Sequence, residues 1–319
     1  MTADVSAGAT APAHEQLAAP ARTGPADPDG LRLGVVVITM GQRPAELSAL
    51  LRGVAGQQGP AARTVVVGNG VSTADLGDLG DALTVDLPEN LGIPGGRNAG
   101  VEALGDSVDV LVFLDDDGSL PEDTFNRGLR AAFAANPRLG IVSCRITDPV
   151  SGEVQRRHVP RIRVGDPDQS SEVTTFLGGA SAVRRAVLEQ VGGLPDEFFY
   201  CHEETDLAWR ALDAGWSIEY RADLTMNHPA TSPSRHATYH RLVARNRVWL
   251  ARRNLPWPLI PVYLGVWTAL TLARTRSLST LKVWLAGFAE GWRKPCGPRK
   301  AMRWRTVWRM ARLGRPPII

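Results

Sequence analysis

Three consecutive acids, Asp115, Asp116 and Asp117, follow the apolar run VLVFL. Carboxylates this close raise one another's pKa unless a cation or N–H donors compensate them. Oxygen ligands of this kind suit Mg²⁺ or Mn²⁺, commonly with substrate phosphates completing the coordination. Asp is also a normal N-cap residue, so the triplet indicates either a divalent-cation site or an acidic turn that caps the next helix.

A second acidic group, HEETD, runs from His202 to Asp206. It is not a zinc-protease motif, because that motif requires a second His where Asp206 stands. Acids at the start of a helix are favoured by its positive end, which alone would explain them. One of the carboxylates, on Glu203 or Glu204, could instead act as a general base for an attacking hydroxyl.

A glycine-rich segment, ENLGIPGGRNAG, lies between Glu89 and Gly100. Its spacing does not match the G-x-G-x-x-G dinucleotide fingerprint. Either it brings backbone close to a ligand, with Arg97 and Asn98 projecting, or it is a purely structural turn.

The elements that must position these residues follow a β-α-β pattern. Continuous apolar runs predict buried strands at 33–39, 64–67, 83–87 and 109–114. Helices are expected after Pro44, over 96–104 and 121–135, near Arg184, and over 203–214. Such runs indicate an α/β fold with a Rossmann-like, mostly parallel sheet covered by helices on both faces. Ligands bind such sheets at the carboxyl ends of the strands.

Charge divides the 319 residues unevenly. Residues 235–319 hold 18 Lys and Arg but a single acid, Glu290, and seven of the nine Trp lie between Trp249 and Trp308. This basic, Trp-rich extension needs a negatively charged partner, either a membrane surface or a nucleic acid. The Ala- and Pro-rich residues 1–30 predict a disordered leader rather than a signal peptide. Three scattered cysteines, Cys144, Cys201 and Cys296, favour a reducing cytoplasm.

The extension is expected to be helical. The 19 residues from Leu255 to Ala273 carry no charge, which is close to the length that spans a bilayer. Three prolines lie near the start of this segment, and arginines flank both sides. We therefore expect helices lying on an anionic leaflet, with peripheral attachment to the inner face of the plasma membrane. The alternative is an apolar helix packed on the rest of the chain.

Two stretches carry a family resemblance: VLVFLDDDGSLPEDT and GGASAVRRAVLEQVGGLPDEFFYCHEETDLAWRALDAGW. Over about residues 31–250 the chain resembles the family-two glycosyltransferases, in particular the rhamnosyltransferase-like group, which have the GT-A fold. The resemblance implies a GT-A catalytic domain over 31–232, after the leader at 1–30. Residues 233–319 then form the membrane-associating extension.

The resemblance also implies roles for residues. The expected metal ligands are Asp115, Asp117 and His228, although His228 alone would pass for an ordinary surface histidine. The expected catalytic pair is Glu203 and Glu204, with Glu204 as the base. The expected donor-binding residues are Thr39, Asn69, Arg97, Asp115 and Asp116, and the expected acceptor residues are Gly178, Gly179 and Asp206. The family's second strand normally ends in a base-reading Asp, and here Gly68 takes that place, leaving Asn69 as the substitute.

Together these features predict an inverting glycosyltransferase dependent on Mg²⁺ or Mn²⁺, which moves a hexosyl or deoxyhexosyl group from a nucleotide-diphosphate sugar. UDP- or TDP-sugars are the favoured donors. A glycan or lipid-linked acceptor in cell-envelope or polysaccharide synthesis is expected, and no nucleic acid. The alternatives are a nucleotidyltransferase, and a nucleic-acid-binding protein that uses the basic tail but leaves the acidic triplet unexplained.

Overall fold

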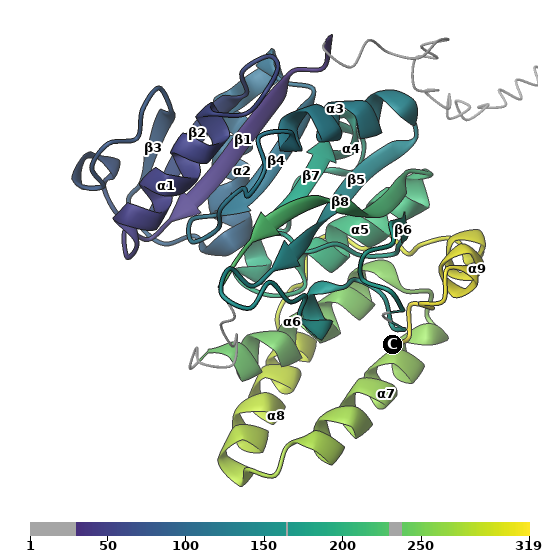
Figure 1. Cartoon of the computed structure of the whole chain (residues 1–319). Helices are drawn as coiled ribbons and strands as arrows, with labels where there is room; N and C mark the ends of the chain where they lie inside the picture. Colours follow the sequence, from purple (N-terminus) through teal and green to yellow (C-terminus); the bar gives the residue numbers. More distant parts are fainter. Residues whose placement is uncertain (1–29, 164, 230–237) are drawn as a thin grey trace, which may run out of the picture.

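The computed structural model describes residues 30–163, 165–229 and 238–319, and its centre is one eight-stranded sheet (Figure 1). The strands are β1 Leu33–Thr39, β2 Arg63–Asn69, β3 Leu83–Leu87, β4 Val110–Asp115, β5 Leu139–Thr147, β6 Ser171–Glu172, β7 Ala180–Arg184 and β8 Ser217–Asn227. Their order is β3-β2-β1-β4-β7-β5-β8-β6. Strands β3, β2, β1 and β4 run parallel to one another, whereas β7 runs antiparallel to both β4 and β5.

The apolar runs form strands because both faces of the sheet are buried. On β1, Val36 joins a hydrophobic core on one face, while Val35 and Val37 join a second core on the other. A solvent-facing strand would instead alternate apolar and polar residues. The predicted α/β fold with a mostly parallel sheet is therefore confirmed.

Helices cover both faces (Figure 1). They are α1 Pro44–Ala55, α2 Gly92–Leu104, α3 Phe125–Ala135, α4 Arg185–Val191, α5 Glu203–Ala214, α6 Tyr239–Asn254, α7 Leu259–Arg274, α8 Leu278–Arg293 and α9 Trp304–Arg312. Helices α1 and α3 pack in the core that contains Val35, whereas α4 and α5 pack in the core that contains Val36.

The basic extension is helical, as predicted. Its first helix, α6, shares the hydrophobic core with α5 through Val248 and Trp249. Helix α8 crosses α6 closely, since a Cβ on Gly287 would overlap the Arg241 carbonyl oxygen. Helices α7 and α8 extend away from the sheet (Figure 1). Among the helices of the described residues, none is both long and apolar enough to cross a membrane. Residues 1–29 of the leader expected at 1–30, and the boundary expected after residue 232, lie outside the described residues.

Candidate functional site

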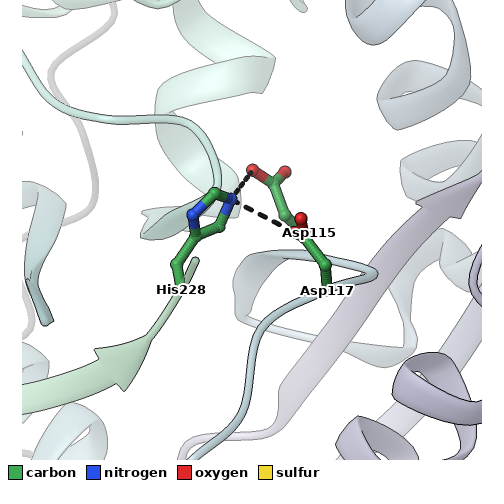
Figure 2. A group of neighbouring side chains, drawn as sticks. All are labelled: Asp115, Asp117 and His228. Carbon is green, nitrogen blue, oxygen red and sulfur yellow. Dashed lines mark ion pairs between the residues drawn. The ribbon is translucent and has the colours of Figure 1, made fainter. Parts of the chain in front are cut away.

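The acidic triplet lies at the carboxyl end of β4, and β8 brings His228 beside it. His228 Nε2 lies 3.1 Å from Asp117 Oδ1 and 3.6 Å from Asp115 Oδ2 (Figure 2). One ligand atom from each of these three residues falls within 4.8 Å of the others. Carboxylates suit Mg²⁺ and Mn²⁺, and the added imidazole favours a transition metal such as Mn²⁺ over Mg²⁺. The three side chains predicted to bind a metal are therefore together and fit a divalent cation.

Cations compensate the triplet, although no partner was evident near it in the sequence. Arg43 Nη1 lies 2.6 Å from Asp117 Oδ2 and 3.3 Å from Asp116 Oδ1, and Thr39 donates to Asp116 at 2.7 Å. Burial raises the pKa of Asp116 despite the hydrogen bond from Thr39. Burial lowers the pKa of His228, but the hydrogen bonds and charges of Asp115 and Asp117 outweigh it and raise that pKa to about 10. The three carboxylates are thus stabilised by the positive charges of Arg43 and His228 that lie beside them.

Arg97 connects this cluster to the start of α5. The guanidinium is 3% exposed and lies 3.2 Å from Asp115 Oδ1 and 3.5 Å from Glu204 Oε1. Burial acts to raise the pKa of Asp115, but His228 and Arg97 together bring it below its ordinary value. The structure thus places the expected base and a candidate metal ligand on the two sides of one arginine. The expected contact of Arg97 with a diphosphate stays a prediction.

Two glycines permit this close arrangement. A Cβ on Gly178 would overlap Arg97 and Glu204, and a Cβ on Gly179 would overlap the Asp115 carboxylate. Both glycines were expected to let an acceptor approach the backbone. In this structure the close approach they permit is to the chain's own side chains.

Glu203 and Glu204 have different surroundings at the start of α5. Glu203 is 1% exposed and its Oε2 has no hydrogen-bond partner among the described residues, whereas the Glu204 side chain is 21% exposed. Burial and the neighbouring Glu204 raise the pKa of Glu203 well above its ordinary value. A buried carboxyl whose ionised form is disfavoured therefore lies next to the more accessible Glu204, which is the better placed of the two to act as a general base.

The loop before α5 is strained and is held by α6. Phe199, Cys201 and His202 all have positive φ, which is uncommon for residues other than glycine. Asn246, fully buried on α6, donates from Nδ2 to the carbonyl oxygens of Phe198 at 2.9 Å, and of Tyr200 and Cys201 at 2.8 Å. These bonds fix the loop that leads to Glu204.

The structure corrects the expectation for Asp206. Its side chain is fully buried, and its carboxylate accepts from Arg210 at 2.8 Å, Arg253 at 3.0 Å and Asn254 at 2.7 Å. The Asp206 carboxylate therefore links α5 to α6 through these hydrogen bonds, and its burial keeps it from contacting an acceptor.

The Asn69 side chain also makes hydrogen bonds within the protein. Its Oδ1 accepts from the Leu91 N–H at 2.9 Å, and its Nδ2 donates to Asn90 Oδ1 and to the Gly92 carbonyl. A Cβ on Gly68 would overlap the Val71 carbonyl oxygen, so this backbone excludes the usual Asp. Base reading by Asn69 stays a prediction, and its observed role is to fix the turn before α2.

Sequence reasoning missed Arg43 and Asn246. Arg43 follows the carboxyl end of β1, where ligand-binding residues are expected, and this position was the available signal. No signal in the sequence pointed to Asn246, because only the packing of α6 against the loop shows that its amide faces three carbonyls.

Comparisons with known proteins identify the family of this chain. The sequence profile of a family described as "Glycosyl transferase family group 2" matches residues 110–292. A pre-mycofactocin glycosyltransferase of Mycobacterium tuberculosis is 28% identical over 204 residues, which cover 60% of this chain and 40% of the relative. The chain thus spans well under two thirds of the length of the curated relatives it matches.

Solved structures establish the fold. The mannosyltransferase PcManGT from Pyrobaculum calidifontis, in complex with GDP-Man and Mn²⁺, is 18% identical, with a TM-score of 0.53 over 89% of this chain and 84% of that one. S. aureus TarS residues 1–349, in complex with UDP-GlcNAc, is 14% identical, with a TM-score of 0.58 over 82% and 80%. The fold is therefore that of the GT-A glycosyltransferases, as the resemblance implied.

Proposed function

The chain belongs to glycosyl transferase family group 2, and from this premise we propose that it transfers a hexosyl or deoxyhexosyl group from a nucleotide-diphosphate sugar to an acceptor hydroxyl, with inversion. The observation that carries the proposal is the arrangement of Arg97, which lies between Asp115 of the candidate metal site and Glu204. A donor diphosphate held at one side of this arginine would present its sugar to a base at the other side.

Asp115, Asp117 and His228 would hold the divalent cation. The bound cation supplies charge that neutralises the donor diphosphate as it leaves. Arg43 is the remaining cation beside the triplet, and its side chain is 30% exposed, so it can turn towards a phosphate oxygen. Stabilisation of the leaving diphosphate is the largest catalytic effect that this arrangement offers.

Glu204 acts as the base. It takes the proton from the acceptor hydroxyl as that oxygen forms its bond to the anomeric carbon, while the bond to the diphosphate breaks on the opposite face. Burial disfavours the ionised form of Glu203, so this residue stays out of proton transfer. Its buried carboxyl supports the position of Glu204.

The donor nucleotide is a uridine or thymidine diphosphate. Asn69 Oδ1 and the Asp86 carboxylate, near the ends of β2 and β3, already accept from Leu91 and from Ser72 and Thr73, but an amide or carboxylate oxygen has a second lone pair that would accept from the imide N–H of such a base. Calorimetry with UDP, TDP and GDP in the presence of Mn²⁺ tests this choice. Tighter binding of GDP would refute it.

The extension lies on an anionic membrane surface, and the acceptor is a glycan or a lipid-linked sugar of the cell envelope. Helix α7 is uncharged up to Arg274, yet of its residues only Ile260, Tyr263 and Leu264 are buried. A helix that is apolar all round normally lies in a protein core or a membrane. Its exposed face, together with neighbouring basic residues, suits a lipid interface.

A panel of nucleotide sugars tests the enzymatic proposal. The full chain with Mn²⁺ is expected to release the nucleoside diphosphate, whereas a nucleotidyltransferase would release pyrophosphate. Excess chelator and Asp117→Asn should each abolish release while the fold persists. Full activity in chelator would overturn the metal-dependent mechanism.

A further inference from the structure

A cavity of about 70 Å³ lies between α5, α6, α7 and the C-terminal residues 315–319. Its size is several times the roughly 15 Å³ that one water molecule needs. None of the candidate metal ligands lines it. Its walls include Arg247, Arg315, His202 and Thr174, together with Tyr263 and Trp267 of α7.

The two arginines are unusual because no described carboxylate forms an ion pair with either. Arg247 is 9% exposed, and its guanidinium carbon lies 3.6 Å from the centre of the Trp267 ring, which holds the cation in place. Burial lowers the pKa of both guanidinium groups, and the charges of Arg156 and Arg247 lower that of Arg315 further. Burying a cation without a counter-charge is costly. An anion in the cavity would offset this cost.

Uncharged polar groups around the cavity are also unsatisfied. The Thr174 side chain is 1% exposed, and its hydroxyl has no hydrogen-bond partner among the described residues. The same holds for His202 Nε2 and Trp267 Nε1. Buried polar atoms in native proteins are nearly always paired, so such a group of orphans requires an explanation. All of them can donate a hydrogen bond.

We infer that this cavity binds a phosphate group carried by the acceptor, an inference that rests on the proposed function. Residues that carry two guanidinium groups and several neutral donors line the cavity from different elements, which suits a tetrahedral oxyanion with three or more acceptor oxygens better than a planar carboxylate. His202, directly before α5, and Thr205, in its first turn, line the cavity, and Glu204 lies between them in the chain. A phosphate held here anchors the acceptor next to the base.

Helix α7 connects this anion site to the exposed apolar surface. Tyr263 and Trp267 form part of the cavity wall, while Val262 on the same helix is 45% exposed. The phosphate could thus come from a lipid headgroup or from a water-soluble phosphate ester. Both share the chemistry that the cavity recognises, and the experiment distinguishes them.

Calorimetry of the full chain in chelator, with inorganic phosphate and pyrophosphate as probes, tests the site without the metal-dependent donor. Arg315→Gln should weaken binding by about tenfold or more, because a charge-assisted bond to phosphate is lost. Arg312→Gln, an exposed arginine three residues earlier, is the matched control and should bind like the parent chain. Equal binding by both variants would overturn the inference.

Thr174→Val provides a second variant that keeps the fold. It replaces an unpaired buried hydroxyl with a methyl group of similar shape, so the melting temperature should stay the same or rise. Phosphate binding should nevertheless fall by about threefold to tenfold, since one donor to the anion is removed. A variant with unchanged phosphate affinity would contradict the assignment of Thr174 to the site.

Neutral detergent micelles that contain phosphatidic acid distinguish the source. Competition of this lipid with pyrophosphate, lost in Arg315→Gln, identifies a lipid phosphate. Binding of the inorganic probes without lipid competition identifies a soluble phosphate ester. If neither probe binds while UDP or TDP with Mn²⁺ still does, the inference fails and the proposed glycosyl transfer is unaffected.

Discussion

Asn246 on α6 donates a hydrogen bond from Nδ2 to the Cys201 carbonyl oxygen at 2.8 Å, and so holds a residue of positive φ two positions before Glu203. A strained backbone of this kind persists only where its surroundings enforce it, at a cost of about 1–3 kcal/mol per residue. The strain therefore depends on an amide that touches neither the candidate metal ligands nor Glu204.

Asn246→Asp should lower kcat by about tenfold to a hundredfold, because a carboxylate cannot donate to the three carbonyls and the base is misplaced. The affinity for the donor nucleotide with Mn²⁺, measured by calorimetry, should change much less. Asn246→Gln keeps the donor group and should retain more activity than the Asp variant. Parental turnover by Asn246→Asp would show that the loop holds its conformation without this amide.

Glu204→Gln should reduce the rate by about two to four orders of magnitude, as expected when a general base is lost. Glu203→Gln should reduce it far less, since burial and the neighbouring Glu204 raise the pKa of Glu203 and disfavour the ionised form that a base needs. Turnover at saturating donor checks both, with donor binding measured in parallel. The opposite order of effects would assign the base to Glu203.

Gly179→Ala should raise the Mn²⁺ concentration needed for half-maximal activity and lower activity by about tenfold to a hundredfold, the range typical of disturbed metal ligands. A Cβ at this position overlaps the Asp115 carboxylate, which must then move away from His228 and Asp117. Gly53→Ala on α1 is the control, because its Cβ would meet only Leu120 at 4.0 Å. Titration of activity with Mn²⁺ measures the effect, and equal curves for the two variants would contradict it.

Local patterns predicted the strands well, since the bounds of β1 and β3 follow directly from apolar runs at 33–39 and 83–87. They failed for contacts between distant segments. Glu204 and Asp206 look alike as acids at a helix start, and only the packing of α6 shows that Asp206 is buried against Arg253. The antiparallel insertion of β7 between β4 and β5 likewise has no local signature.

Glu290 is the only acid among residues 235–319, and it joins α6 to α8. Its carboxylate lies 2.7 Å from Arg241 Nε and 2.9 Å from Lys294 Nζ. Burial acts to raise the pKa of Glu290, but these two cations outweigh it and lower the pKa to about 2. The ordinary value is 4.5, so the pair contributes stability that is complete above pH 4.5 and is lost as the pH falls towards 2.

Glu290→Gln should therefore lower the melting temperature near pH 6 and have little effect near pH 2.5. Thermal unfolding of both proteins across this range checks the prediction. Glu189→Gln is the control, because that glutamate is 61% exposed and pairs only with Arg185 on α4. A difference between parent and Glu290→Gln that stays constant with pH would show that the ion pair is not its origin.

The full chain should bind anionic vesicles of phosphatidylglycerol at low salt and bind phosphatidylcholine vesicles weakly. Exposed apolar residues gather on α7 and α8, where Leu272 is 52% and Leu278 76% exposed. Exposed basic residues, Arg274, Arg276 and Lys282, lie among them, and each contributes about 1 kcal/mol at an anionic surface.

Replacing Leu272 and Leu278 with Asp should reduce co-sedimentation, because their side chains then no longer enter the interface. Val150→Asp is the control, since Val150 is 94% exposed but lies outside the extension. Salt raised from about 0.05 M to about 0.5 M should weaken binding by screening the basic residues. Co-sedimentation of the double variant equal to that of the control, or no binding of the parent chain at low salt, would show that α7 and α8 do not contact lipid.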